Sequence, residues 1–282
     1  MKTILEILQL TTDFLKQKGF SNPRRQAQEL ISDALHLKIV DLYLSYDRPL
    51  TEIELKECRE RLSRRLTGEP CAYIHGEVEF YNCHLTVSPS VLIPRQETGL
   101  LVDSIVQHLK SVDLENKVLW DVCSGSGCIG IALKKQFPSL NVVLSDISPD
   151  ALKIATENSK KNNVEIECLQ GDLLNPFEGR LADFIVCNPP YISEKEYGSL
   201  DPDVKNFEPQ LALIAGPKGT EYYELLAERL PKFLRSGAKV WLEMGATQGE
   251  SLKNLFSVYP WRSLSIQKDW AGHDRFFFLE NE

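Results

Sequence analysis

The segment most indicative of the architecture of this chain is Asp121-Val-Cys-Ser-Gly-Ser-Gly-Cys-Ile-Gly130. It overlaps the end of the apolar run Lys117–Val122, which is typical of a buried strand, and it opens a helical pattern. Its glycines permit a tight turn and let a ligand approach the backbone closely. Asp146 ends the next strand-like run, about 20 residues further on, where a carboxylate can accept hydrogen bonds from ribose hydroxyls. The sequence therefore predicts a nucleoside-binding turn between a strand and a helix.

Outward from this turn, short apolar runs alternate with helical stretches, the first of these helices covering residues 97–110. Such alternation predicts β-α-β units and a mainly parallel sheet with helices on both faces, a Rossmann-like α/β fold. Two later runs are joined by a short turn without a helix, so we expect them to pair as an antiparallel edge. The parallel strands are expected at Lys117–Val122, Asn141–Ser145, Val164–Leu169, Ala182–Cys187 and Ala238–Glu243, and the edge strands at Ser263–Lys268 and Arg275–Glu280.

The first third of the chain predicts a small helical bundle. Capping boxes begin at Thr3 and Thr51, and Asn22 precedes a proline as an N-cap would, so helices are expected to start at these three residues. Residues 69–90 contain β-prone pieces, Tyr73-Ile74 among them, which favours a β-hairpin linker. We therefore expect a helical domain at 1–68, a linker at 69–90 and a catalytic domain at 91–282.

A second motif, Asn188-Pro189-Pro190-Tyr191, follows the predicted strand Ala182–Cys187. Its two prolines stiffen the backbone and remove N–H donors, so the segment offers carbonyl acceptors, to which Asn188 adds its side-chain oxygen. A planar NH2 group can donate to these acceptors while Tyr191 stacks on its face. Because ligands of open α/β sheets bind at the carboxyl ends of the strands, the motif indicates a site for an amide or an exocyclic amine.

Composition excludes several classes of protein. The chain has 282 residues, 43% of them hydrophobic, and no apolar run approaches the length of a membrane span. The N-terminus does not resemble a signal peptide, so we expect a cytosolic protein. A net charge of −8 weighs against binding to nucleic acid. Seven cysteines without C-x-x-C spacing and five histidines without paired spacing predict reduced thiols and no metal.

Together these residues resemble the class I S-adenosylmethionine-dependent methyltransferases. Four further segments sharpen the resemblance to the N5-glutamine methyltransferases of peptide chain release factors, over nearly the whole chain. These segments are Ile93–Thr98, Asn188–Ile192, Phe207–Pro209 with Ala212-Leu213, and Leu242–Gly249. The resemblance implies methyl transfer from S-adenosylmethionine, leaving S-adenosylhomocysteine, to the glutamine of a release factor's GGQ motif. It also implies a role in translation termination, and we expect a monomer that makes no direct contact with nucleic acid.

The resemblance also implies site residues. Three positions, Gln96, Gly99 and Leu173, depart from the family's usual pattern. Substrate contacts are implied for Arg95, Glu97, Thr98 and the motif Asn188, Pro189, Pro190 and Tyr191, of which the last four are the expected catalytic residues. Contacts to S-adenosylmethionine are implied for Asp121, Cys123, Ser124, Gly125, Ser126, Gly127, Asp146, Ile147, Asp172, Leu173 and Asn188.

Other interpretations remain open from the sequence. A nucleic-acid amino-methyltransferase acting on adenine N6 or guanine N2 would use the same Asn-Pro-Pro-Tyr geometry. A nicotinamide-dependent oxidoreductase would use the glycines alone, and a non-catalytic module would need neither site. The row Arg59, Arg61, Arg64 and Arg65 predicts either a solvated helix face or a docking surface for an acidic partner.

Overall fold

The computed structural model describes residues 2–282, which form two compact units. The helical unit contains the residues up to Gly76 together with the separate segment Asp201–Phe207. The sheet unit contains Glu77–Leu200 and Glu208–Glu282. Within the described residues, no helix combines the length and the apolar character that crossing a membrane requires.

The helical unit begins as the capping boxes predicted. The Thr3 side chain accepts from the Glu6 N–H while the Glu6 carboxylate accepts from the Thr3 N–H, and Thr51 and Glu54 repeat this exchange. Asn22 departs from expectation, because its backbone is left-handed and its side chain caps nothing, although the helix does begin at the following proline. The helices are α1 (Ile4–Gln17), α2 (Pro23–Ala34), α3 (Ile39–Leu44), α4 (Glu52–Leu66), α5 (Cys71–His75) and, from the separate segment, α10 (Pro202–Phe207).

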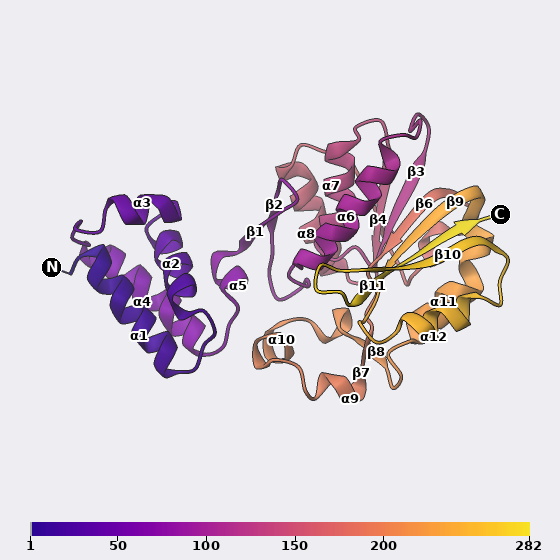
Figure 1. The fold of residues 1–282 in the computed structure, drawn as a ribbon. Coiled ribbons are helices and arrows are strands. Elements are labelled where there is room, and N and C mark those ends of the chain that lie inside the picture. Colours follow the sequence, from indigo (N-terminus) through magenta and orange to yellow (C-terminus); the bar gives the residue numbers. More distant parts are fainter. Residues whose placement is uncertain (1) are drawn as a thin grey trace. The chain divides into compact units, whose positions relative to one another are not determined.

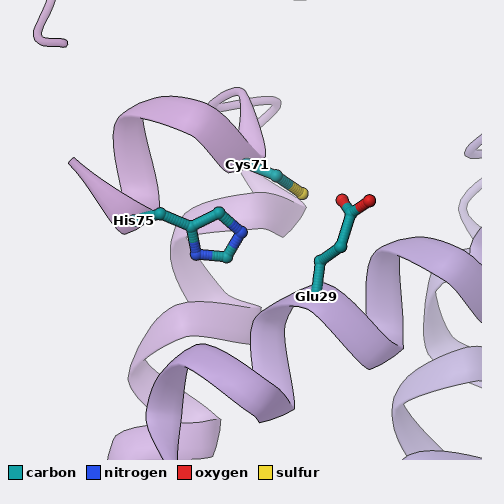
Figure 2. Close-up of side chains that lie close together, drawn as sticks. All are labelled: Glu29, Cys71 and His75. Carbon is teal, nitrogen blue, oxygen red and sulfur yellow. The ribbon is translucent and has the colours of Figure 1, made fainter. Parts of the chain in front are cut away.

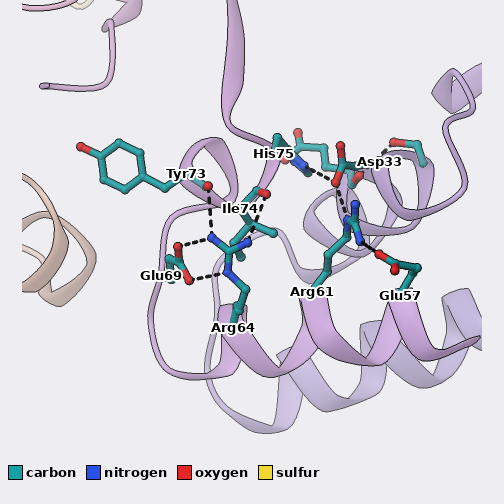
Figure 3. Close-up of polar contacts among 10 residues, drawn as sticks. Asp33, Glu57, Arg61, Arg64, Glu69, Tyr73, Ile74 and His75 are labelled. Carbon is teal, nitrogen blue, oxygen red and sulfur yellow. Dashed lines mark hydrogen bonds and ion pairs between the residues drawn. The ribbon is translucent and has the colours of Figure 1, made fainter. Parts of the chain in front are cut away.

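Three of the four arginines on α4 are engaged inside the helical unit. Arg61 pairs with Asp33 and Glu57, and Arg64 binds both carboxylate oxygens of Glu69 and two backbone carbonyls (Figure 3). Arg65 is 4% exposed and donates to Gln26, the Glu69 carbonyl and Asp203. A solvated face does not describe Arg61 and Arg65, whereas Arg64 remains exposed while it makes these bonds, and docking by this face stays a prediction. The three side chains tie α4 to α2, α5 and α10.

The predicted linker contains a helix as well as a hairpin. Tyr73 and Ile74 lie in α5, so the β-strand predicted for them is wrong. Pro70 precedes this helix, and the positive φ of Gly76 ends it. The hairpin of β1 (Glu77–Phe80) and β2 (Cys83–Thr86) belongs to the sheet unit. There Asn158 of α8 (Pro149–Lys161) and Asn162, the residue that caps the end of α8, exchange hydrogen bonds with the backbone of β2.

The sheet unit contains the predicted sheet. Its seven strands run in the order β10-β11-β9-β6-β3-β4-β5, parallel in the centre and antiparallel at the β9, β11 and β10 edge. Helices α6 (Gln96–Leu109), α7 (Cys128–Gln136) and α8 cover one face, and α11 (Glu221–Arg229) and α12 (Gly249–Phe256) cover the other (Figure 1). The strands are β3 (Val118–Val122), β4 (Asn141–Asp146), β5 (Glu167–Gln170), β6 (Ala182–Cys187), β9 (Leu234–Glu243), β10 (Trp261–Lys268) and β11 (Asp274–Asn281).

Strand register places the motifs at one edge. Val122 pairs with Ser145 of β4 and with Cys187 of β6, and Cys187 pairs with Leu242 of β9. The residues that follow these pairs, Cys123, Asp146, Asn188 and Glu243, therefore lie in a row at the carboxyl ends of the strands. The remaining elements are β7 (Ile192–Ser193), α9 (Glu194–Tyr197), β8 (Ile214–Gly216) and three short 3-10 turns (Asn175–Phe177, Gln210–Ala212, Leu230–Phe233).

Candidate active site

A pocket lies along the carboxyl edge of the sheet, and twelve of the predicted site residues line it. They come from five separate parts of the chain: the start of α6 with the residue before it, the turn after β3, the end of β4, the end of β5, and the loop after β6. Five other predicted residues, Asp121, Gly127, Pro189, Tyr191 and Glu97, are not part of its lining. The twelve are Arg95, Thr98, Cys123, Ser124, Gly125, Ser126, Asp146, Ile147, Asp172, Leu173, Asn188 and Pro190.

The turn after β3 is held against β4 by its own backbone. The Ser124 N–H donates to the Ser145 carbonyl at 2.9 Å, and the Gly125 N–H donates to Asp146 Oδ2 at 2.8 Å. Cys123 and Gly125 both have positive φ, which glycine adopts without strain. Ser124 Oγ is buried at the pocket wall and has no hydrogen-bond partner among residues 2–282. A polar ligand group in the pocket would satisfy this hydroxyl.

Asp146 presents a carboxylate to the pocket. Oδ1 accepts from the Ser148 N–H at 2.9 Å and Oδ2 accepts from the Gly125 N–H, so each oxygen keeps a lone pair for a ligand. Burial raises the pKa of this carboxyl, and the backbone N–H donors oppose the rise. The position and acceptor character of Asp146 fit a ribose diol.

Asp121 supports the turn from behind. It is 1% exposed, and its Oδ2 accepts from the Gly130 N–H at 2.8 Å. Burial raises its pKa to about 7. Asp121 therefore links β3 to the first turn of α7, and the structure gives it a supporting position instead of the predicted place in the pocket wall.

The Asn188–Tyr191 motif is fixed from its far side by Gln248. The Gln248 Nε2 donates to the Tyr191 carbonyl at 3.0 Å and to the Gly219 carbonyl at 2.9 Å, while its Oε1 accepts from the Gly245 N–H. The Tyr191 side chain packs against the core between the sheet and α11, and burial raises its pKa to about 12. Stacking of Tyr191 on a substrate stays a prediction.

The segment Ile93–Thr98 and the segment Phe207–Pro209 meet through one buried acid. Glu208 is 5% exposed, accepts from the Ile93 N–H at 3.1 Å and pairs with the Arg95 guanidinium. Arg95 and Pro209 both line the pocket. Two stretches more than a hundred positions apart thus form one wall of the site.

Tyr222 and Glu243 stand out among the residues at the site that were not predicted from the sequence. Tyr222, on α11, lines the pocket although no motif includes it. Glu243, the last residue of β9, is 1% exposed behind the motif and accepts from Thr98 Oγ1 at 2.7 Å and from the Asn188 side chain. Burial raises the pKa of Glu243 to about 7, and the bonds from Thr98 and Asn188 oppose that rise. The signal in the sequence that could have identified Glu243 is its place in the segment Leu242–Gly249, which carries part of the family resemblance.

A group of potential metal ligands lies in the helical unit. Glu29 on α2 and Cys71 and His75 on α5 bring their ligand atoms within 4.8 Å of one another (Figure 2). Glu29 also pairs with Arg25, His75 Nδ1 lies 3.4 Å from Asp33, and burial raises the pKa of the Cys71 thiol to about 11. These partners and the protonated thiol oppose metal binding, and the prediction of no metal stays untested.

Comparisons with known proteins agree with this architecture. Residues 97–200 match the family model of the methyltransferase small domain, and residues 6–76 match that of the PrmC N-terminal domain. A release factor glutamine methyltransferase of Chlamydia trachomatis is 42% identical, covering 98% of this chain and 94% of the relative. One from Geobacter sulfurreducens is 35% identical, covering 97% and 95%. A Pyrococcus furiosus methyltransferase structure shares the fold, with a TM-score of 0.52 at 17% identity over 78% of this chain and 98% of that one.

Proposed function

This chain belongs to the release factor glutamine methyltransferase family, and from that premise we propose that it methylates the side-chain amide nitrogen of a glutamine in a peptide chain release factor. The observation that supports the proposal most directly is that Asn188 and the turn Cys123–Ser126 line one pocket. A cofactor site and an amide-binding motif at the same sheet edge suit methyl transfer to a planar nitrogen. Family membership favours glutamine over a nucleic-acid base.

The methyl donor is S-adenosylmethionine. The residues of the pocket fit it. Asp146 offers acceptors for ribose hydroxyls, the Ser124 hydroxyl has no hydrogen-bond partner in the described part of the chain, and Ile147 and Leu173 supply apolar walls for a base. When bound, the donor supplies a methyl group on a sulfonium that becomes a neutral thioether as the methyl leaves. We propose that the turn Cys123–Ser126 with Asp146, Ile147, Asp172 and Leu173 holds it, and that Asp121 and Gly127 shape the turn from behind.

Positioning of the substrate is the chain's main contribution to the reaction. An amide nitrogen is a poor nucleophile because its lone pair is delocalised into the carbonyl. We propose that Asn188 Oδ1 and the Pro189 carbonyl each accept a hydrogen bond from the NH2 group of the substrate amide. These two bonds would point the nitrogen at the methyl group of the donor. Such orientation can lower a barrier by up to about 7–11 kcal/mol. The nitrogen gains a C–N bond and then loses one proton to water or an acceptor, so no strong base has to act first.

The experiment that tests this function is transfer of labelled methyl to three competing acceptors: unmodified folded release factor, total tRNA with ribosomal RNA, and unmethylated DNA. We expect label on a single glutamine of the release factor, the one in its GGQ motif. Label only in nucleic acid would overturn the substrate assignment while leaving the donor site intact.

The finer assignments complete the proposal. We propose that the helical unit helps to dock the release factor, that Arg95, Glu97 and Thr98 shape the substrate side of the site, and that the enzyme acts as a cytoplasmic monomer without direct contact to nucleic acid. Because Arg61 and Arg65 are mostly covered and bonded within their own unit, a docking surface on α4 would use the exposed Arg59 and Arg64 instead.

A further inference from the structure

We propose that Glu243 is a positioning residue that fixes which end of the Asn188 side-chain amide faces the substrate. The inference rests on the proposed function, since it assigns a task within the same site. Glu243 does not line the pocket and would not touch the substrate. It acts through Asn188, which does line it.

The geometry follows from strand register. Leu242 pairs with Cys187 in the parallel pair β9 and β6, so Glu243 and Asn188 are neighbours just beyond that pair. Glu243 is 1% exposed and has two side-chain donors, the Thr98 hydroxyl at 2.7 Å and the Asn188 amide. Thr98 is 2% exposed in the first turn of α6. Two side chains of the pocket wall, Thr98 and Asn188, are thus joined by hydrogen bonds to the buried Glu243 behind them.

The direction of these bonds decides what the substrate meets. An ionised carboxylate only accepts hydrogen bonds, and an asparagine amide has a donor end, Nδ2, and an acceptor end, Oδ1. Asn188 therefore turns Nδ2 toward Glu243 and leaves Oδ1 for the pocket. A substrate amide nitrogen carries two N–H donors. Asn188 Oδ1 can accept a hydrogen bond from one of them, whereas Nδ2, itself a donor, would repel them. The charge on Glu243 thus selects the orientation that catalysis needs.

Protonation of Glu243 would remove this selection, because a carboxylic acid can itself donate to Oδ1. Burial raises the pKa of Glu243 to about 7, so its charge changes around neutral pH. The charged and titratable groups facing it are Arg275 of β11, which favours the ionised form, and Glu97 of α6, which opposes it. Tyr191, Tyr223 of α11 and Cys128 of α7 also interact with its charge. Substrate turnover should therefore rise with pH as Glu243 ionises.

The test is the pH profile of kcat/KM for the release factor, which reports groups of the enzyme before that substrate binds, between about pH 5.5 and pH 9, for wild type and Glu243→Gln at saturating donor. Glutamine keeps the size and can still bond both neighbours, but it carries no charge and permits either orientation of Asn188. We expect wild type to rise to a plateau with a midpoint near 7. The profile of the variant should lack that midpoint. Its kcat/KM should lie at least about tenfold below the wild-type plateau, the factor that corresponds to the loss of one hydrogen bond to a charged group.

Two further substitutions show whether Glu243 itself sets the midpoint. Asp121→Asn removes the other buried carboxyl with a pKa near 7, and the profile should keep its midpoint in that variant. Thr98→Val removes the hydroxyl that lowers the pKa of Glu243, so the midpoint should move to higher pH, whereas Thr98→Ser should restore it. The Thr98 pair also decides the matter if Glu243→Gln does not fold.

The outcomes separate this inference from the proposed function. A wild-type enzyme that labels no glutamine would overturn the function. A wild-type enzyme that labels glutamine, with a Glu243→Gln variant of unchanged rate and midpoint, would overturn the role of Glu243 alone. A midpoint that does not move between Thr98→Val and Thr98→Ser would also count against it.

Discussion

Replacing Gly130 with alanine tests how closely α7 packs on the sheet behind the cofactor turn. A Cβ at Gly130 would lie 2.3 Å from Leu144 Cδ2 and 3.1 Å from both Asp121 Oδ2 and Val142 Cγ1. Carbon atoms in ordinary contact are about 3.5–4.0 Å apart, so the buried Leu144 side chain or the helix must shift by more than about 1 Å. Such overpacking costs about 1–3 kcal/mol, and alanine in a helix returns about 0.5–1 kcal/mol.

We therefore expect Gly130→Ala to lower the free energy of unfolding by about 2 kcal/mol, near the upper end of that balance. Gly99→Ala is the matched control, because Gly99 is also helical and its nearest neighbour, Phe80 Cε2, is 3.8 Å away. The control should gain about 0.5–1 kcal/mol.

Urea unfolding monitored by circular dichroism measures both variants, and calorimetry should show weaker donor binding for Gly130→Ala alone. Leu144→Ala removes the clashing atom, so the double variant should be more stable than the sum of the single effects by at least about 1 kcal/mol. Equal stability of Gly130→Ala and Gly99→Ala would refute the packing argument.

The site itself offers four more tests. Asn188→Ala should collapse kcat while the donor dissociation constant, measured by calorimetry, stays nearly unchanged. Asp146→Ala should first weaken donor binding. The reverse pattern would mean that the two roles are misassigned. Gln248→Ala leaves two carbonyls and one N–H without their partner, so kcat should fall with little change in donor affinity, and an unchanged kcat would argue against the clamp. Because burial raises the pKa of Asp121 to about 7, its folded-state carboxyl keeps a proton that the unfolded chain releases near pH 3.8. Wild type should therefore lose stability relative to Asp121→Asn as pH rises between those two values, and then level off, in urea unfolding across pH. Treatment with a chelator should leave methyl transfer unchanged, because no proposed step uses a metal. Loss of activity that zinc restores would instead indicate a metal site, for which the cluster of Glu29, Cys71 and His75 in Figure 2 is the candidate.

Local signals predicted local structure well. The capping boxes at Thr3 and Thr51 hold all their partners within four positions, so reading along the chain finds both ends of the bond. The central strands β3 and β6 were predictable because burial on two faces demands continuous apolar runs. Tyr73 and Ile74 misled because aromatic and β-branched residues favour strands, whereas here both side chains are buried in a short helix between Pro70 and Gly76.

What the sequence could not reveal is which polar side chains meet. Thr98 and Glu243 are 145 positions apart, and Arg95 and Glu208 are 113 apart. No spacing rule connects such residues, because strand order and the return of the chain bring them together. For the same reason the α4 arginines looked like a charged surface, although their partners Asp33, Glu69 and Asp203 lie on other segments. The motifs indicated which segments of the chain line the pocket. They did not indicate that Asn188 lies in the pocket wall whereas Glu243 lies behind it.

The makeup of the helical unit limits how this enzyme can be recombined with its relatives. That unit is discontinuous, since it includes Asp201–Phe207 from deep within the second half of the chain. Arg65 pairs with Asp203 across 138 positions, and the space beside Gly68 is filled by Phe207. A chimera that exchanges only the first 76 residues would separate these partners and leave a buried guanidinium beside a foreign side chain. A chimera that exchanges the first 76 residues together with Asp201–Phe207 keeps the pair intact, so Arg65 and Asp203 should come from the same parent protein.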